Sequence, residues 1–145
     1  MAFRPRRFLA PASVLLAAYA GLCLLLFGQQ RELIYLPSHT RVAAADTDFA
    51  LPREDGVVLR GWLAAPGRPD ALIYFGGNAE DVGRLRDRVD RLFPGHAVYL
   101  LAYRGYGASD GRPREADLGA DALALYDHVR ASRPKARIRV VGRSL

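Results

Sequence analysis

The chain has 145 residues, of which 50% are hydrophobic and 25% charged, enough for one globular domain with a core. Its formal net charge is +6. Without Arg4, Arg6 and Arg7 the chain has 18 basic and 15 acidic residues, a net charge of +3. The arginines of "VGRLRDRVDRLF" are interleaved with Asp87 and Asp90, a pattern typical of a solvated helix face. Charge therefore argues against nucleic-acid binding.

The first element is an uncharged run from residue 8 to residue 27, "FLAPASVLLAAYAGLCLLLF". Twenty residues of helix rise about 30 Å, the thickness of the hydrocarbon core of a bilayer. Residues 1–27 are therefore predicted to form an arginine-rich tip and a transmembrane anchor, and the lipid bilayer is the expected partner of residues 8–27. Because arginines precede the run, the N-terminus is predicted to be cytoplasmic and the rest to lie on the far, periplasmic or extracellular, side.

Secretion after signal-peptide cleavage is the alternative, because Ala18-Tyr19-Ala20 has the small-x-small form of a processing site. The apolar run continues past that site as "GLCLLLF", which favours an uncleaved anchor. Cys23 follows Leu22, where a lipid-anchor signal needs a small residue. As the only cysteine it permits no internal disulfide, and its expected role is that of a small hydrophobic side chain.

Residues 28–45 are predicted to be a connector, with Tyr35 placed to lie near the membrane interface. Two strand candidates follow, "DTDFALP" and "VVLRGWLAA", separated by the turn signal "REDG". This arrangement predicts an antiparallel pair. Trp62, in the second strand, is expected in the core.

From residue 71 the pattern alternates between buried strands and amphipathic helices, which predicts a parallel sheet covered on both faces. The predicted strands are "ALIYF", "AVYLLAY" and "ARIRVVG". The first helix has its apolar face on Val82, Leu85, Val89, Leu92 and Phe93. The second begins near Pro113 and has its apolar face on Leu118, Ala122, Leu125 and Val129.

The chain closes on "VVGRSL", which matches all but the last residue of the nucleophile-elbow motif G-x-S-x-G through Gly142 and Ser144. This motif needs a strand before it, because the sharp turn from strand to helix lifts the serine clear of the sheet. "IRVV" meets that requirement. Ser144 is the predicted catalytic nucleophile, and its alternative role is that of a helix cap.

The second motif is "YFGGNAED", a glycine-rich turn after the first parallel strand. Acyl transfer places negative charge on oxygen, and fixed backbone N–H groups must meet it. The predicted oxyanion donors are the N–H groups of Asn78 and Leu145, with Gly76 and Gly77 forming the turn. A phosphate-binding loop is disfavoured because the lysine and longer glycine spacing of a P-loop are absent. A plain turn that caps the following helix remains an alternative.

Together, "LIYFGGNAEDV", "YRGYGASDGRPRE" and "VVGRSL" resemble the alpha/beta-hydrolase superfamily, in particular its membrane-anchored, serine-aminopeptidase-like branch of esterases and lipases. The resemblance runs from about Glu32 to Leu145. Members of this branch often have His-Gly-Asn where this chain has Gly76-Gly77-Asn78. The resemblance implies an N-terminal part of an alpha/beta-hydrolase sheet, and a loop near the site that includes Tyr103, Arg104, Gly105, Gly107 and Ser109.

The family's triad runs in the order Ser, then Asp or Glu, then His, so the resemblance implies that the triad acid and histidine are absent from this chain. His39, His96 and His128 all precede Ser144 and are expected to be surface or structural residues. Residues 46–145 are thus expected to be an incomplete domain, the N-terminal fragment of a serine hydrolase that is inactive as given. The alternative is a non-catalytic, membrane-tethered binding or structural module.

The expected substrate is a small acyl ester or a peptide-like molecule, cleaved at an ester, thioester or amide bond. No metal site is predicted, because one cysteine and scattered histidines have no ligand spacing. Nothing in the sequence calls for a cofactor.

Overall fold

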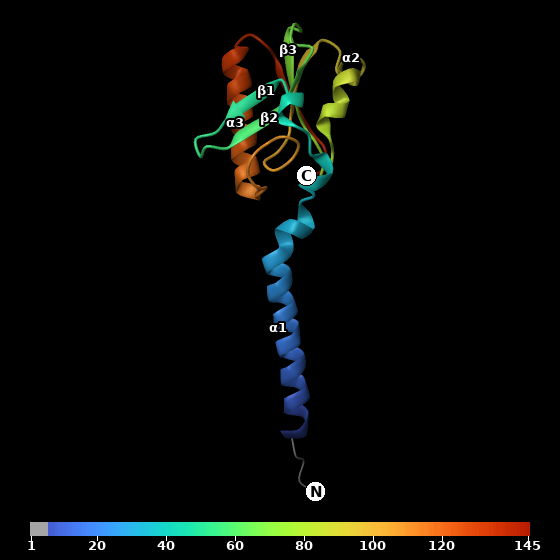
Figure 1. The fold of residues 1–145 in the computed structure, drawn as a ribbon, viewed down its shortest axis with the longest axis vertical. Coiled ribbons are helices and arrows are strands. Elements are labelled where there is room, and N and C mark those ends of the chain that lie inside the picture. Colours follow the sequence, from blue (N-terminus) through green and yellow to red (C-terminus); the bar gives the residue numbers. More distant parts are fainter. Residues whose placement is uncertain (1–5) are drawn as a thin grey trace. The chain divides into compact units, whose positions relative to one another are not determined.

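A computed structural model describes the backbone from residue 6 to residue 145 and the side chains from residue 11 onward (Figure 1). The chain divides into two compact units, Met1–Ile34 and Tyr35–Leu145. Arg4, and the side chains of Arg6 and Arg7 on which the predicted orientation depends, lie outside the described residues.

The first unit is the helix α1 (Arg6–Ile34), which continues beyond Phe27 through residues expected in the connector. It is the one described helix that is long and apolar enough to cross a membrane, and none of its most apolar stretch is buried. Signal sequences near an N-terminus pass the same test of length and composition.

The second unit begins with two short 3₁₀ helices, η1 (Pro37–Thr40) and η2 (Ala44–Asp46). The predicted hairpin follows as β1 (Phe49–Pro52) and β2 (Val58–Ala64), which pair antiparallel. Trp62 lies in the core at 3% exposure, and its indole N–H donates to the Asp46 carbonyl at 2.6 Å.

Three more strands complete a five-stranded sheet: β3 (Asp70–Phe75), β4 (His96–Leu101) and β5 (Ile138–Gly142). The order is β1-β2-β4-β3-β5, with β2 antiparallel to β4 and β3 parallel to both β4 and β5. The strand that follows β3 in sequence therefore pairs on one side of it, and β5 pairs on the other.

Helices cover both faces of this sheet, as predicted (Figure 1). The long helix α3 (Glu115–Ser132) packs on one face through Leu125 and Val129. The 3₁₀ helix η3 (Val82–Arg88) and the short α2 (Val89–Leu92) pack on the other. Because strand side chains alternate, Ala71 and Ile73 belong to the α3 core.

The apolar spacing from Val82 to Phe93 predicts a single amphipathic helix. The structure corrects this prediction, because residues Val82–Arg88 form a 3₁₀ helix and only Val89–Leu92 are α-helical. Gly83 lies so close to the Trp62 ring that an added Cβ would come within 2.7 Å of it. The tighter winding places Val82 and Val89 on the sheet while Gly83 accommodates the indole. Periodicity alone cannot distinguish the two helix types over so few residues.

Candidate active site

The two motifs singled out in the sequence meet at the carboxyl ends of two neighbouring strands, β3 and β5. Phe75, the last residue of β3, lies opposite Gly142, the last residue of β5, in parallel register. The Arg143 N–H extends this ladder by donating to the Phe75 carbonyl at 3.0 Å. The Gly-Gly turn and the serine therefore leave the sheet side by side.

Ser144 occupies a left-handed backbone conformation, with φ at +65°. The Leu145 N–H donates to the Arg143 carbonyl at 3.0 Å, which closes a three-residue γ-turn around the serine. A side chain in this region is sterically strained, typically by about 1–3 kcal/mol, and such strain is common at functional sites. The exposed Ser144 side chain thus lies on a strained bend directly after a strand.

The Gly-Gly turn is tightly packed at Gly76, where a side chain is excluded, and has room for a Cβ at Gly77. A Cβ added at Gly76 would lie 2.4 Å from Val82 Cγ1. A Cβ added at Gly77 would lie 3.4 Å from the Arg143 carbonyl oxygen and 3.6 Å from Ser144 Cβ. The turn before Asn78 therefore lies beside the serine, with space between them for no more than about one methyl group.

Replacing Gly76 by alanine is expected to destabilise the domain by about 1–3 kcal/mol, because the new methyl overlaps Val82 in a packed core. In the Val82→Ala background, Gly76→Ala should cost at most half as much stability, because the overlapping methyl group of Val82 is gone. Thermal unfolding of the parent, the two single variants and G76A/V82A measures this difference. The matched control is Gly119→Ala in α3, where no atom lies within 4 Å and alanine should stabilise. A Gly76→Ala protein as stable as the parent would show that the turn is not tightly packed.

Asn78 is held through its side chain to two other segments. Its Oδ1 accepts hydrogen bonds from the Leu36 N–H at 3.0 Å and from the Tyr106 hydroxyl at 2.7 Å. The next residue, Ala79, has φ at +59°, so the turn reverses immediately after the predicted donor. The sequence pointed to the backbone of Asn78, and the structure adds a role for its amide side chain in binding the segment after α1 to the turn.

The loop after β4 lies beside the Gly76-Gly77 turn, near the candidate site as the resemblance implied. The Tyr103 hydroxyl donates to the Gly76 carbonyl at 2.9 Å, and its ring stacks on Phe75. Burial, together with the negative charge of Glu80, raises the pKa of Tyr103 to about 12, so the phenol remains a neutral donor at physiological pH. Tyr103 therefore holds the Gly76 peptide through its carbonyl oxygen.

Arg104, Gly107 and Ser109 of the same loop are structural. The buried Ser109 hydroxyl accepts from the Arg60 N–H at 2.8 Å and donates to the Ala102 carbonyl at 2.7 Å. Gly107 has φ at +51° and its N–H donates to the Thr40 hydroxyl. Arg104 is directed away from the site to an ion pair in α3.

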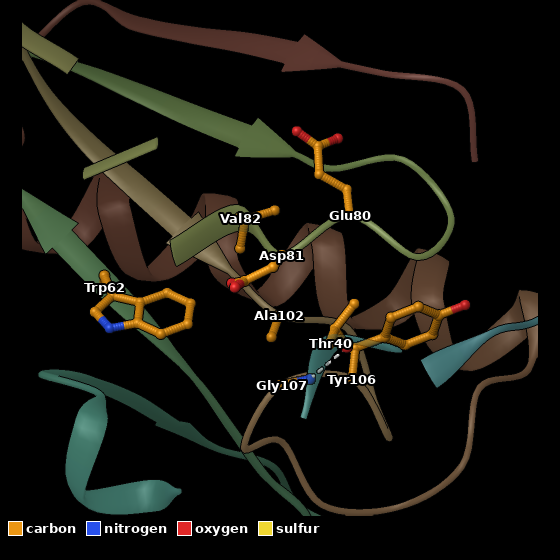
Figure 2. Close-up of a pocket in the computed structure, with 8 residues that line it drawn as sticks. All are labelled: Thr40, Trp62, Glu80, Asp81, Val82, Ala102, Tyr106 and Gly107. Atoms are coloured by element: carbon orange, nitrogen blue, oxygen red, sulfur yellow. Dashed lines mark hydrogen bonds between the residues drawn. The ribbon is translucent and has the colours of Figure 1, made fainter. Parts of the chain in front are cut away.

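A small pocket lies next to the turn, lined by Thr40, Trp62, Glu80, Asp81, Val82, Ala102, Tyr106 and Gly107 (Figure 2). It has room for about one water molecule. It is too small to bind an acyl group.

No protein-family model matches the chain. The uncharacterised protein Rv2307c of Mycobacterium tuberculosis is 32% identical over 157 aligned positions, covering 100% of this chain and 56% of that protein. WAV2 of Arabidopsis thaliana, named as alpha/beta hydrolase domain-containing, is 31% identical, covering 87% of this chain and 46% of WAV2. The chain therefore spans about half the length of these curated relatives.

The esterase Pf2001 of Pyrococcus furiosus has a similar solved structure, with 25% identity and a TM-score of 0.54 over 66% of this chain and 38% of the esterase. The chain contains part of an alpha/beta-hydrolase fold. The relatives likewise support the alpha/beta-hydrolase superfamily. The mixed sheet with helices on both faces, predicted from the sequence, is thus confirmed.

The three histidines have contacts elsewhere in the domain. His39 lies exposed in η1, and His128 packs edge-on against Phe49 at a centroid distance of 5.4 Å. His96 is buried at the start of β4, where its Nδ1 lies 2.9 Å from the Pro94 carbonyl, at the end of the parallel strands opposite to Ser144. Among residues 11–145, no group of three or more His, Cys, Asp or Glu side chains is arranged to hold a metal ion.

Sequence reasoning missed one component of the candidate site, the carboxylate of Glu80. Its Oε2 accepts from the Gly77 N–H at 2.7 Å, and its Oε1 accepts from the Tyr74 hydroxyl at 3.0 Å. Arg143, next to the serine, lies 3.1 Å from the same Oε1. The only sequence signal for Glu80 is an acidic residue in the turn "GGNAED".

Proposed function

We propose that this chain provides the nucleophile and oxyanion donors of a membrane-anchored serine hydrolase that cleaves an ester, thioester or amide through an acyl-enzyme. The observation that carries the proposal is the strained bend at Ser144, directly after β5 and against the glycine turn that follows β3. Few backbone arrangements tolerate a non-glycine residue there, and the nucleophile elbow is one of them.

In this proposal the Ser144 hydroxyl attacks a carbonyl carbon while its proton passes to a histidine base. The carbonyl oxygen becomes negative and accepts hydrogen bonds from the backbone N–H groups of Asn78 and Leu145. The leaving alcohol, thiol or amine takes up the proton, and water later releases the acyl group. Because the Leu145 N–H donates to Arg143 in the γ-turn, rotation of the Ser144–Leu145 peptide must accompany oxyanion binding.

The triad acid and histidine are not assigned to residues of this chain, because the order of the superfamily places both after the nucleophile. The 145 residues alone are accordingly expected to be inactive, since a serine hydroxyl without a base is a weak nucleophile. The assignment to a serine-aminopeptidase-like branch, and a small acyl ester or peptide-like substrate, belong to the same proposal. So does an anchor in α1 with a cytoplasmic N-terminus.

Covalent labelling tests the proposal. Membranes that carry the protein expressed from its own locus are treated with a fluorophosphonate, and the modified residue is located by peptide mass spectrometry. The expected result is a single adduct on Ser144. An adduct confined to another serine, or no adduct on the folded protein, would contradict the assignment.

A further inference from the structure

The Glu80 carboxylate joins three segments of the candidate site. It accepts hydrogen bonds from Tyr74 at the end of β3 and from the Gly77 N–H in the turn, and it pairs with Arg143 at the end of β5. The Glu80 side chain is only 15% exposed, whereas that of Arg143 is 68% exposed. Figure 2 shows the Glu80 carboxylate directed toward the end of β3, while the adjacent Asp81 points away from it.

Glu80 holds Gly77 from both sides of that residue. Its side chain accepts from the Gly77 N–H at 2.7 Å, and its own N–H donates to the Gly77 carbonyl at 3.0 Å. That carbonyl belongs to the same planar trans peptide as the Asn78 N–H, so the two point in opposite directions. The backbone N–H of Glu80 thus holds the peptide that carries the proposed oxyanion donor, and the Glu80 carboxylate restrains the peptide on the other side of Gly77.

The negative charge of the Glu80 carboxylate would oppose an anion at this site unless a positive charge offset it, and Arg143 provides that charge. A carboxylate beside the Gly77 turn would repel the negative oxygen that forms next to Ser144. Glu80 already acts on its surroundings, since its charge raises the pKa of Arg143 and, after burial, contributes to the raised pKa values of Tyr74 and Tyr103. The guanidinium of Arg143 lies against the same carboxylate and offsets its field.

We infer that Glu80 is a positioning residue for the oxyanion hole and that Arg143 is its counter-ion. The positive charge of Arg143 keeps the Glu80 carboxylate from opposing the negative charge of the transition state. This inference rests on the proposed serine-hydrolase function. It assigns no contact with the substrate to either side chain. It explains why an acidic side chain is compatible with a site that must stabilise an anion.

The test compares rates of fluorophosphonate modification of Ser144 in the protein expressed from its own locus. The variants are Glu80→Ala, Glu80→Gln, Arg143→Gln and the double variant E80Q/R143Q. The matched control is Arg139→Gln, an exposed arginine in β5. Thermal midpoints of all variants are recorded in parallel.

Arg143→Gln is expected to slow modification about tenfold, because it leaves the Glu80 charge uncompensated. Glu80→Ala should slow it by a similar factor, since the Gly77 N–H loses its acceptor. Glutamine keeps an acceptor without the charge, so Glu80→Gln and the double variant should both react within about threefold of the parent. The double variant should therefore be faster than Arg143→Gln alone, and Arg139→Gln should be unchanged.

A purely structural pair gives a different pattern. In that case the double variant would be the slowest, and the rates would follow the thermal midpoints, which would overturn the inference. If the unaltered protein is not modified at Ser144 at all, the proposed function fails and this inference fails with it. The two failures are distinguishable because only failure of the proposed function leaves the parent and every variant unreactive.

Discussion

Ser144→Ala is expected to lower ester hydrolysis by the protein expressed from its own locus by a factor on the order of 10³ or more. The side chain is the proposed nucleophile, and loss of a serine nucleophile removes the acyl-enzyme route altogether. Hydrolysis of a short p-nitrophenyl ester is the measurement. The control is Ser132→Ala, an exposed serine at the end of α3 that should leave the rate unchanged.

Ser144→Gly separates the chemical role of this residue from its backbone strain. Glycine tolerates φ near +65° without the steric cost borne by a Cβ, so this variant should be inactive and about 1 kcal/mol more stable than Ser144→Ala. Thermal unfolding of the two inactive variants measures the difference. Residual hydrolysis above a tenth of the parent rate, in either variant, would refute the assignment of Ser144.

Asp121→Ala is expected to destabilise the domain by about 3–5 kcal/mol, the typical result of removing one partner of a buried ion pair. Asp121 is 3% exposed in α3, and its two oxygens accept from Arg104 Nε at 2.6 Å and Nη2 at 2.9 Å. Arg53 donates to the same carboxylate at 2.9 Å, and Arg104 also pairs with Asp55. The pairing with Asp121 raises the pKa of Arg104, which therefore stays charged.

Urea unfolding of the full chain in detergent, followed by circular dichroism, measures this effect. Asp127→Ala, an exposed aspartate on the same helix, is the matched control and should change stability by less than about 0.5 kcal/mol. The apolar replacement R104M/D121L should recover most of the loss, because removing both buried charges avoids the desolvation penalty. A cost below 1 kcal/mol for Asp121→Ala would mean that this ion pair contributes little to stability.

The elements that local pattern predicts well are those whose side chains are buried on a regular repeat. The apolar runs in β3 and β4 have no other stable place than a sheet covered on both faces, and both lie close to their predicted bounds. The segment from Val82 was harder to predict, because Gly83 is fitted to a tryptophan that precedes it in the chain by 21 positions. Asp121 lies next to the predicted apolar stripe of α3, and its burial depends on ion pairs with Arg53 and Arg104, which are distant in the chain.

The sequence by itself was enough to propose Ser144 and the Gly76-Gly77 turn as a candidate site, because a glycine-rich turn and a serine after an apolar strand are local features of the chain. It also determined that α1 is apolar enough to span a bilayer. Only the tertiary structure decided that β5 lies beside β3, which brings Ser144 to Gly77, and that Glu80 and Arg143 pair across 63 positions. Such pairings depend on strand order and register, which arise from packing of the whole sheet and leave no mark on local periodicity.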